Sequence, residues 1–257
     1  MNRTVDVVVL AAGRGKRIHQ AFPGVPKVLV PIAGKPMLLR LFDAIEKSGV
    51  ARGITLVVGP AVESKVFAAI PPDVRLVLQP EPRGTGHAVL CTRPDLGDAE
   101  NVLVLYGDHP LIREKTIRRL AEKHVASGAT LTMATVPLPD FSGWRAGFAD
   151  WGRVIRNGDG RVQRIVEAKD ATGTELRVTE VNPSFLCFRA KWLWDHLPKV
   201  GCENAQGEYY LTDLLGLAVS EGVAVETFPL EDAREALGVN TPEQLAQAER
   251  MFLEIYK

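Results

Sequence analysis

The run Val5–Leu10 is rich in β-branched residues and almost entirely apolar, and a loop rich in glycine and basic residues follows it directly. A continuous apolar run of this length is typical of a strand that is buried on both faces of a parallel sheet. Similar runs recur at Ile54–Val58, Val74–Leu78 and Asn101–Leu105, and segments with helical periodicity separate them. The alternation continues to about residue 136. It predicts an α/β fold with a Rossmann-like, open, mostly parallel sheet flanked by helices.

The second half of the chain is less regular and predicts a smaller lobe that is rich in β-structure. Asn157-Gly158-Asp159-Gly160 is a strong turn signal between two expected strands, Arg153–Ile155 and Val162–Glu167. We expect a loop over Phe141–Asp150 and one continuous strand over Glu180–Phe188. The expected helices are Pro36–Ser48, Ala61–Ile70, His87–Thr92, Arg113–Ser127, Lys191–His196, Leu211–Glu221 and a last helix capped by Thr241.

The charge balance and the cysteines argue against several classes of protein. Basic and acidic side chains number 31 each, so no net charge favours binding to nucleic acid or to an anionic membrane. Three scattered cysteines form no CxxC pair, which argues against a disulfide framework and a structural zinc site. The N-terminal apolar run is too short to span a membrane, and no signal-peptide pattern follows it. We expect a soluble, cytoplasmic protein, and the sequence leaves homo-oligomer formation open.

The loop after the first strand has the composition of a phosphate-binding loop. Gly13 and Gly15 let the backbone approach a phosphate closely, and basic residues at positions 14, 16 and 17 add positive charge. Two other motifs do not fit. The dinucleotide fingerprint needs glycine where Ile18 stands, and the Walker A motif needs Ser or Thr where Arg17 stands. Pro26-Lys27 supplies one more cation, and a solvated basic loop is the alternative at this point.

Six motifs follow one another along the chain: Leu10–Arg17 with Pro26-Lys27, Gln79–Ala88, Leu105–Leu111, Ile165–Ala171, Asn204–Asp213 and Gly238–Asn240. In this order they resemble the motifs of the sugar-1-phosphate nucleotidyltransferases. They are most similar to the uridyltransferase (pyrophosphorylase) domain of the bifunctional bacterial enzyme that makes UDP-N-acetylglucosamine. The resemblance implies transfer of a uridylyl group from UTP to N-acetylglucosamine-1-phosphate, with Mg²⁺ as cofactor and pyrophosphate as the second product.

The same resemblance implies one domain over residues 1–257 with the nucleotide-diphospho-sugar transferase fold. Its nucleotide-binding part would comprise about residues 1–136 and 225–257, and its sugar-binding part about residues 137–224. No hexapeptide repeats follow residue 250, so we expect no C-terminal β-helix acetyltransferase domain.

The motif positions imply a role for each site residue. Arg17 and Lys27 would neutralise the triphosphate and the leaving pyrophosphate, because phosphoryl transfer depends mainly on positioning and charge stabilisation. Asp108 and Asn240 offer hard oxygens as metal ligands, which Mg²⁺ prefers. The Gln79 carboxamide offers a donor and an acceptor, which suits the uracil edge. Nucleotide binding is expected at Leu10, Ala11, Ala12, Gly13, Gly15, Gln79, Gly84 and Thr85, and sugar binding at Tyr106, Gly152, Glu167 and Asn182.

Simpler interpretations of these residues stay open. Residues 79–86 are rich in turn formers in any case, and a lone Asp after a strand is often a turn or cap residue. The chain also departs from the subfamily at Pro183-Ser184, where Thr-Gly is usual. The alternatives are therefore a nucleotidyltransferase for another substrate, such as glucose-1-phosphate or dTTP, and a non-catalytic nucleotide-sugar-binding protein.

Overall fold

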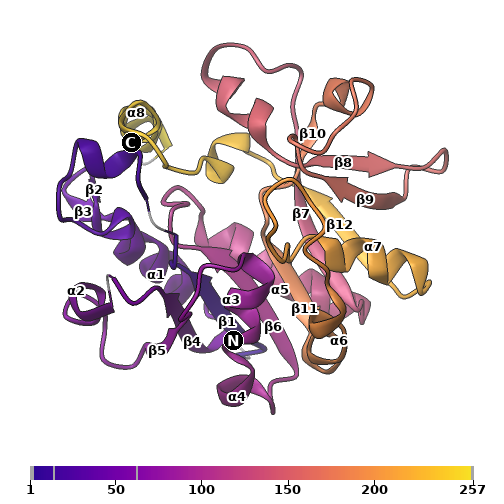
Figure 1. The fold of residues 1–257 in the computed structure, drawn as a ribbon, viewed down its shortest axis with the longest axis horizontal. Coiled ribbons are helices and arrows are strands. Elements are labelled where there is room, and N and C mark those ends of the chain that lie inside the picture. The colour runs from indigo at the N-terminus through magenta and orange to yellow at the C-terminus, as the bar shows by residue number, and fades with distance from the viewer. Residues whose placement is uncertain (1–2, 14, 62, 256–257) are drawn as a thin grey trace.

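The computed structural model describes residues 3–13, 15–61 and 63–255 of the chain. Strands of the first half form the predicted parallel sheet: β1 (Val5–Leu10), β4 (Ala51–Val58), β5 (Arg75–Leu78) and β6 (Asn101–Tyr106) lie in the order β5-β4-β1-β6. They all run in the same direction, so their carboxyl ends meet at one edge of the sheet (Figure 1). This confirms the predicted fold class, and ligands of open α/β sheets bind at such an edge.

The sheet continues with strands from the second half of the chain. The direction changes at β11 (Leu186–Arg189), which lies antiparallel between β6 and β7 (Leu131–Pro137). Beyond β7, the short strand β10 (Glu180–Val181) leads to the antiparallel pair β8 (Arg153–Arg156) and β9 (Val162–Val166). The pair is the predicted hairpin. Figure 1 shows β8, β9 and β10 gathered at one end of the molecule, away from the parallel strands.

Helices cover both faces of the sheet: α1 (Met37–Ser48), α2 (Glu63–Phe67), α3 (Thr85–Leu90), α4 (Arg93–Leu96), α5 (Glu114–Ser127), α6 (Ala190–His196), α7 (Asp213–Ser220) and α8 (Pro242–Ile255). Alternating side chains of β1 enter two hydrophobic cores. Val7 and Val9 pack in a core shared with α1, α5 and α8, and Val8 and Leu10 pack in a core shared with α3, α6 and α7. Burial on both faces explains why this strand is almost entirely apolar.

The expected strand Glu180–Phe188 is wrong, because the structure has two strands there. Between β10 and β11 the chain turns at Asn182-Pro183-Ser184. Pro183 has no N–H for a ladder bond, and Ser184 has a left-handed backbone with φ 61°. The Ser184 N–H donates to Asn182 Oδ1 at 2.9 Å, which holds the turn. The turn takes these three residues out of the sheet and makes them available to a pocket.

Other differences are smaller. The expected loop Phe141–Asp150 contains a 3₁₀ helix at Gly143–Asp150. A strand that was not predicted, β12 (Val225–Pro229), pairs parallel with β7. The Thr241 cap is confirmed, because its Oγ1 accepts a hydrogen bond from the Gln244 N–H at 3.3 Å. Within residues 3–13, 15–61 and 63–255, the helices are all too short or too polar to cross a membrane.

Candidate active site

The loops that follow β1, β5 and β6 meet at the carboxyl edge of the sheet and enclose a pocket, called here the first pocket. Its walls are Leu10, Ala11, Ala12, Gly13, Lys27, Val28, Gln79, Pro82, Gly84, Thr85, Ala88, Tyr106, Asp108 and Glu208. The predicted nucleotide-binding residues are all in this set except Gly15, which lies against the Lys27 side chain instead. The structure therefore brings together segments that are far apart in the sequence.

A second pocket opens beside the first, and Tyr106 and Asp108 line both. The four predicted sugar-binding residues meet here, although they come from the end of β6, from the residue before β8, and from the residues directly after β9 and β10. The walls of this second pocket are Tyr106, Asp108, His109, Asp150, Trp151, Gly152, Glu167, Asn182, Pro183, Ser184, Gly238 and Asn240. A ligand that fills both pockets would lie across the end of β6.

An ion pair between Lys27 and Asp108 lies where the two pockets meet. The Lys27 Nζ atom lies 2.5 Å from Asp108 Oδ2 and 2.7 Å from Asn240 Oδ1. Burial by itself would raise the pKa of the Asp108 carboxyl, but the charges of Lys27 and His109 hold it below its usual value. Asp108 is therefore ionised at neutral pH and can bind a cation.

Asp108 and Asn240 fit a small, hard cation. Their side-chain oxygens converge on one ammonium nitrogen, and the Val239 N–H donates to the Asp108 backbone carbonyl at 2.9 Å, which fixes the two segments side by side. In the described ranges, no group of three or more His, Cys, Asp or Glu side chains is arranged to hold a metal ion. A pair of oxygen ligands suits Mg²⁺, which binds few protein groups and keeps water and phosphate oxygens in its other positions.

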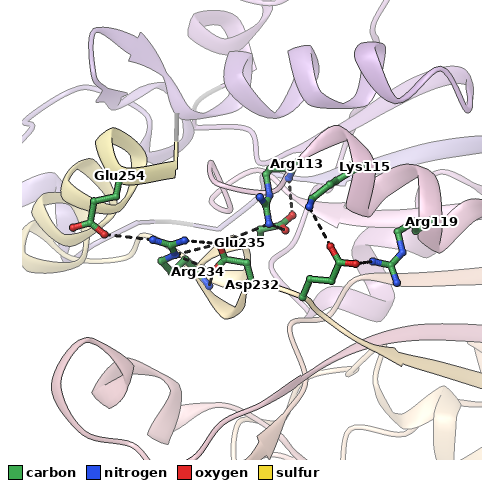
Figure 2. A network of polar contacts seen from close by, with 8 residues as sticks. Arg113, Lys115, Arg119, Asp232, Arg234, Glu235 and Glu254 are labelled. Carbon is green, nitrogen blue, oxygen red and sulfur yellow. Dashed lines mark hydrogen bonds and ion pairs between the residues drawn. The ribbon is translucent and has the colours of Figure 1, made fainter. Parts of the chain in front are cut away.

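A charged network joins the segment after Asp108 to the segment before Asn240 (Figure 2). Arg113 follows Asp108 in the loop after β6, and Glu235 precedes Asn240. The Arg113 backbone N–H donates to Glu235 Oε2 at 3.0 Å, and its guanidinium donates to Oε1. The Glu235 side chain is fully buried, and Figure 2 shows the network continuing to Glu254 of α8. Residues that line neither pocket thus hold the two expected metal ligands at a fixed separation.

The end of the first pocket where a base is expected is built around Gln79, which directly follows β5 and is 4% exposed. Its side-chain nitrogen Nε2 donates to the Gly84 carbonyl at 3.0 Å and lies 3.1 Å from Nδ1 of His87. Gly84 has φ 105°, and a side-chain carbon at this position would lie 2.6 Å from the Tyr209 carbonyl oxygen. Only glycine fits there, so the contact between Gln79 and Gly84 depends on both residue types.

Glu167 is one of the acidic residues in the wall of the second pocket. Its Oε1 atom accepts a hydrogen bond from the Thr212 hydroxyl at 3.3 Å, and a side-chain carbon at Gly152 would lie 3.2 Å from the same oxygen. Burial raises the pKa of the Glu167 carboxyl, the Thr212 hydrogen bond opposes this, and the charges of Asp213 and Asp170 raise it further. In its ionised form a carboxylate can accept hydrogen bonds from the hydroxyl or amide groups of a ligand.

The predicted residues are not all in the pocket walls. Arg17 is exposed and lines neither pocket, and Arg14 lies outside the described residues. Several wall residues are not among the predicted ones, including Glu208 in the first pocket, and His109 and Trp151 in the second. Their positions in the sequence could have identified these three residues, because each lies inside a motif or beside a predicted position.

Comparison with known proteins places the chain in a family. A family model described as the MobA-like NTP transferase domain matches residues 7–201. The chain belongs to this family. The match to the MobA-like NTP transferase domain runs from β1 past α6, and so includes most of the walls of both pockets.

Curated relatives of this MobA-like NTP transferase domain are named bifunctional protein GlmU. The protein from Aromatoleum aromaticum is 47% identical over 247 residues, which are 96% of this chain and 51% of that protein. The protein from Chromohalobacter salexigens is 42% identical over 249 residues, which are 97% of this chain and 52% of that protein. The chain therefore spans about half the length of the curated relatives it matches.

A solved structure shows the same fold. It is described as CMP:2-keto-3-deoxy-manno-octonic acid synthetase complexed with CTP, and it covers 98% of this chain and 99% of its own with a TM-score of 0.71. The sequences are only 16% identical, so the likeness concerns the fold. It confirms the nucleotide-diphospho-sugar transferase fold that the motifs implied.

Proposed function

We propose that the chain catalyses the Mg²⁺-dependent transfer of a uridylyl group from UTP to N-acetylglucosamine-1-phosphate, giving UDP-N-acetylglucosamine and pyrophosphate. The observation that carries the proposal is the shared wall of the two pockets. Because Tyr106 and Asp108 line both, a nucleotide in the first pocket and a sugar phosphate in the second would meet over Asp108. Membership of an NTP transferase family and the relatives named GlmU support the same reaction.

In the proposed reaction, an oxygen of the sugar-1-phosphate attacks the α-phosphorus of UTP. A new P–O bond forms while the bond from the α-phosphorus to the bridging oxygen breaks, and pyrophosphate leaves with that electron pair. Lys27 would neutralise the charge that grows on the phosphates, since its ammonium lies in the wall of the first pocket. The exposed side chain of Arg17 would assist from outside this wall.

Nucleotidyltransferases generally use a divalent metal ion, and we assign Mg²⁺ to the oxygens of Asp108 and Asn240. The ion would neutralise phosphate oxygens during the transfer. The contribution of the chain is to keep both ligands in place, through the Val239 backbone hydrogen bond and the pair Arg113–Glu235.

The two pockets suggest which part of the chain would bind each substrate. We assign UTP to the first pocket, with its base at Gln79, Gly84 and Thr85, and the sugar to the second. Residues 137–224 would supply most of the sugar contacts, namely Gly152, Glu167 and Asn182, while Tyr106 would come from the nucleotide-binding part.

One observation favours a second candidate, the same reaction with another sugar-1-phosphate. Pro183 and Ser184, where the subfamily has Thr-Gly, lie in the wall of the second pocket. The test is the kcat/KM for pyrophosphate release from UTP with N-acetylglucosamine-1-phosphate, glucose-1-phosphate and glucosamine-1-phosphate. If another sugar phosphate is preferred by more than about tenfold, or roughly 1.4 kcal/mol, the second candidate replaces the first.

A further inference from the structure

We propose that His87 is a positioning residue that fixes the orientation of the Gln79 carboxamide and thereby sets the preference for uracil over cytosine. Because this concerns the base end of the first pocket, it rests on the proposed function. Gln79 is in the wall of that pocket, whereas His87 lies on α3 behind it and lines a separate groove with Leu90 and Tyr209. His87 can therefore act on a bound base through Gln79.

The Gly84 carbonyl decides which end of the amide faces it. A carbonyl oxygen only accepts hydrogen bonds, so the Gln79 atom 3.0 Å away is the nitrogen Nε2. Its second N–H is directed to Nδ1 of His87, 3.1 Å away. Both N–H groups of the Gln79 amide therefore have an acceptor. The oxygen Oε1 is the polar atom that Gln79 presents to a base.

The same contact fixes the tautomer of His87. To accept from Gln79, Nδ1 must carry a lone pair, so the ring proton is on Nε2. His87 Nε2 lies 3.9 Å from the Cys91 sulfur, which accepts this weak hydrogen bond. Burial raises the pKa of the Cys91 thiol, so the sulfur is uncharged. The groups from the Gly84 carbonyl through the side chains of Gln79 and His87 to Cys91 therefore have one consistent pattern of donors and acceptors.

Uracil and cytosine differ at N3, the base atom that Gln79 Oε1 would contact. Uracil has an N–H at N3, which Oε1 accepts, whereas cytosine has a lone pair at N3, which Oε1 repels. A triphosphate held near Lys27, as proposed, would keep the base from shifting to bring another atom opposite Gln79. An amide that turned by half a rotation would present Nε2 instead and would favour cytosine. His87 opposes that rotation together with the Gly84 carbonyl, because the turned amide would face both the Nδ1 lone pair and the carbonyl oxygen with an oxygen.

The test compares three variants with the wild-type protein. His87→Leu removes the acceptor, and His87→Asn restores one, because the Asn Oδ1 atom takes about the place of Nδ1. Leu90→Ala is the matched control, since it disturbs the packing of α3 without a contact to the Gln79 amide. The readout is the ratio of kcat/KM for UTP to that for CTP. The ratio of dissociation constants for UDP and CDP, measured by calorimetry, gives a second readout that needs no turnover.

We expect His87→Leu to lower both preferences for uracil by about tenfold, equivalent to ~1.4 kcal/mol. His87→Asn should restore them to within about threefold of the wild-type value, a difference of less than ~1 kcal/mol. A purely structural role would weaken both nucleotides alike and leave the preferences unchanged. Unchanged preferences in a folded His87→Leu protein, no recovery in His87→Asn, or an equal effect of Leu90→Ala would each overturn the proposal.

The two proposals fail in different ways. If the wild-type protein releases no pyrophosphate with any nucleoside triphosphate and sugar phosphate, the proposed reaction fails. The binding ratio of UDP to CDP still tests His87 in that case. If the wild-type protein is active with UTP and the His87 variants keep its selectivity, only the role of His87 fails.

Discussion

The Lys27 ammonium and the Asp108 carboxylate form an ion pair 2.5 Å long at the junction of the two pockets. Only 11% of the Lys27 side chain and 16% of the Asp108 side chain are exposed. Asn240 completes the contact, so the ammonium occupies the position that a cation bound by these two oxygens would take. A metal ion bound there as proposed would therefore compete with Lys27 for Asp108 in the ligand-free protein, and this competition can be measured.

Lys27→Met should increase the stabilisation that Mg²⁺ provides. Without magnesium the variant leaves Asp108 without a cation partner. Loss of a largely buried pair should lower the free energy of unfolding by about 3 kcal/mol. With magnesium the ion no longer has to displace an ammonium, so the rise in Tm should exceed that of the wild-type protein. Thermal unfolding with and without MgCl₂ measures both effects. An equal or smaller rise in the variant would contradict the competition.

The same variant should lose activity, because one preorganised charge donor contributes about 2.7–4 kcal/mol of transition-state stabilisation. Its catalytic efficiency with UTP should therefore fall by roughly two to three orders of magnitude.

Asp108→Ala is the companion variant. It should keep the fold, lose the magnesium-dependent rise in Tm, and lose most magnesium-dependent turnover. Normal activity of Asp108→Ala at limiting Mg²⁺ would argue against its role as a metal ligand.

The buried and exposed parts of the network in Figure 2 should differ strongly in energy. Glu235→Ala leaves the Arg113 guanidinium without a fully buried partner and should lower the free energy of unfolding by about 3–5 kcal/mol. The matched control is Glu231→Ala, whose exposed carboxylate pairs with Lys115 and Arg119. The control should change stability by no more than the error of a urea titration, because exposed ion pairs contribute little.

Glu235 also gives a functional readout that general destabilisation does not explain. Because Glu235 and Arg113 hold the segments of Asp108 and Asn240, Glu235→Ala should raise the Mg²⁺ concentration needed for half-maximal activity at a temperature where the variant is folded. The requirement for UTP should change less. A proportional loss of activity at every Mg²⁺ concentration would show that the pair has only a structural role.

Glu167→Gln should stabilise the protein and weaken its proposed substrate binding. The pKa of Glu167 is raised by burial, so the folded state favours the protonated carboxyl, and this favourable contribution is lost as pH rises through that pKa. Removing the charge should therefore raise Tm near pH 8 by about 2–4 °C, or roughly 1 kcal/mol, with a smaller gain near pH 4. The KM for the sugar phosphate should rise. A Tm gain that is the same at both pH values would contradict this explanation.

Gln79→Glu should affect the nucleotide much more than the sugar phosphate. A carboxylate cannot donate to the Gly84 carbonyl or to His87 Nδ1, and it adds negative charge at the proposed base site. We expect the KM for UTP to rise by about tenfold or more, the effect of ~1.4 kcal/mol, and the KM for the sugar phosphate to change little. Equal changes in both, with a lowered Tm, would indicate general unfolding instead.

Short-range sequence signals predicted several parts of the fold. The apolar run of β1, the turn at Asn157–Gly160 and the Thr241 cap each carry such a signal, and the structure has all three. The insertion of β11 between β6 and β7 has none, because the pairing joins segments that are far apart in the sequence. The turn at Ser184 was missed because serine rarely adopts a left-handed backbone, and here the Asn182 side chain holds it.

The site was predictable where motifs marked single residues, and not where contacts between residues decide the chemistry. The resemblance placed Asp108 and Asn240 together, and the structure brings them to one point. The ammonium of Lys27 between them was not foreseen, because its sequence position implies contact with phosphates. The contact of His87 with Gln79 was also missed, since a histidine on a short helix carries no signal for the direction of its ring.

The hydrogen bond from Lys27 to Asn240 joins positions 213 residues apart, so the site is completed long after its first residues have been made. During synthesis, β1, β6 and the residues around Asp108 emerge well before Asn240. A growing chain can therefore form its parallel strands while it still lacks one of the two oxygens assigned to the metal ion. On the proposed assignment, activity would appear only after Asn240 has been made.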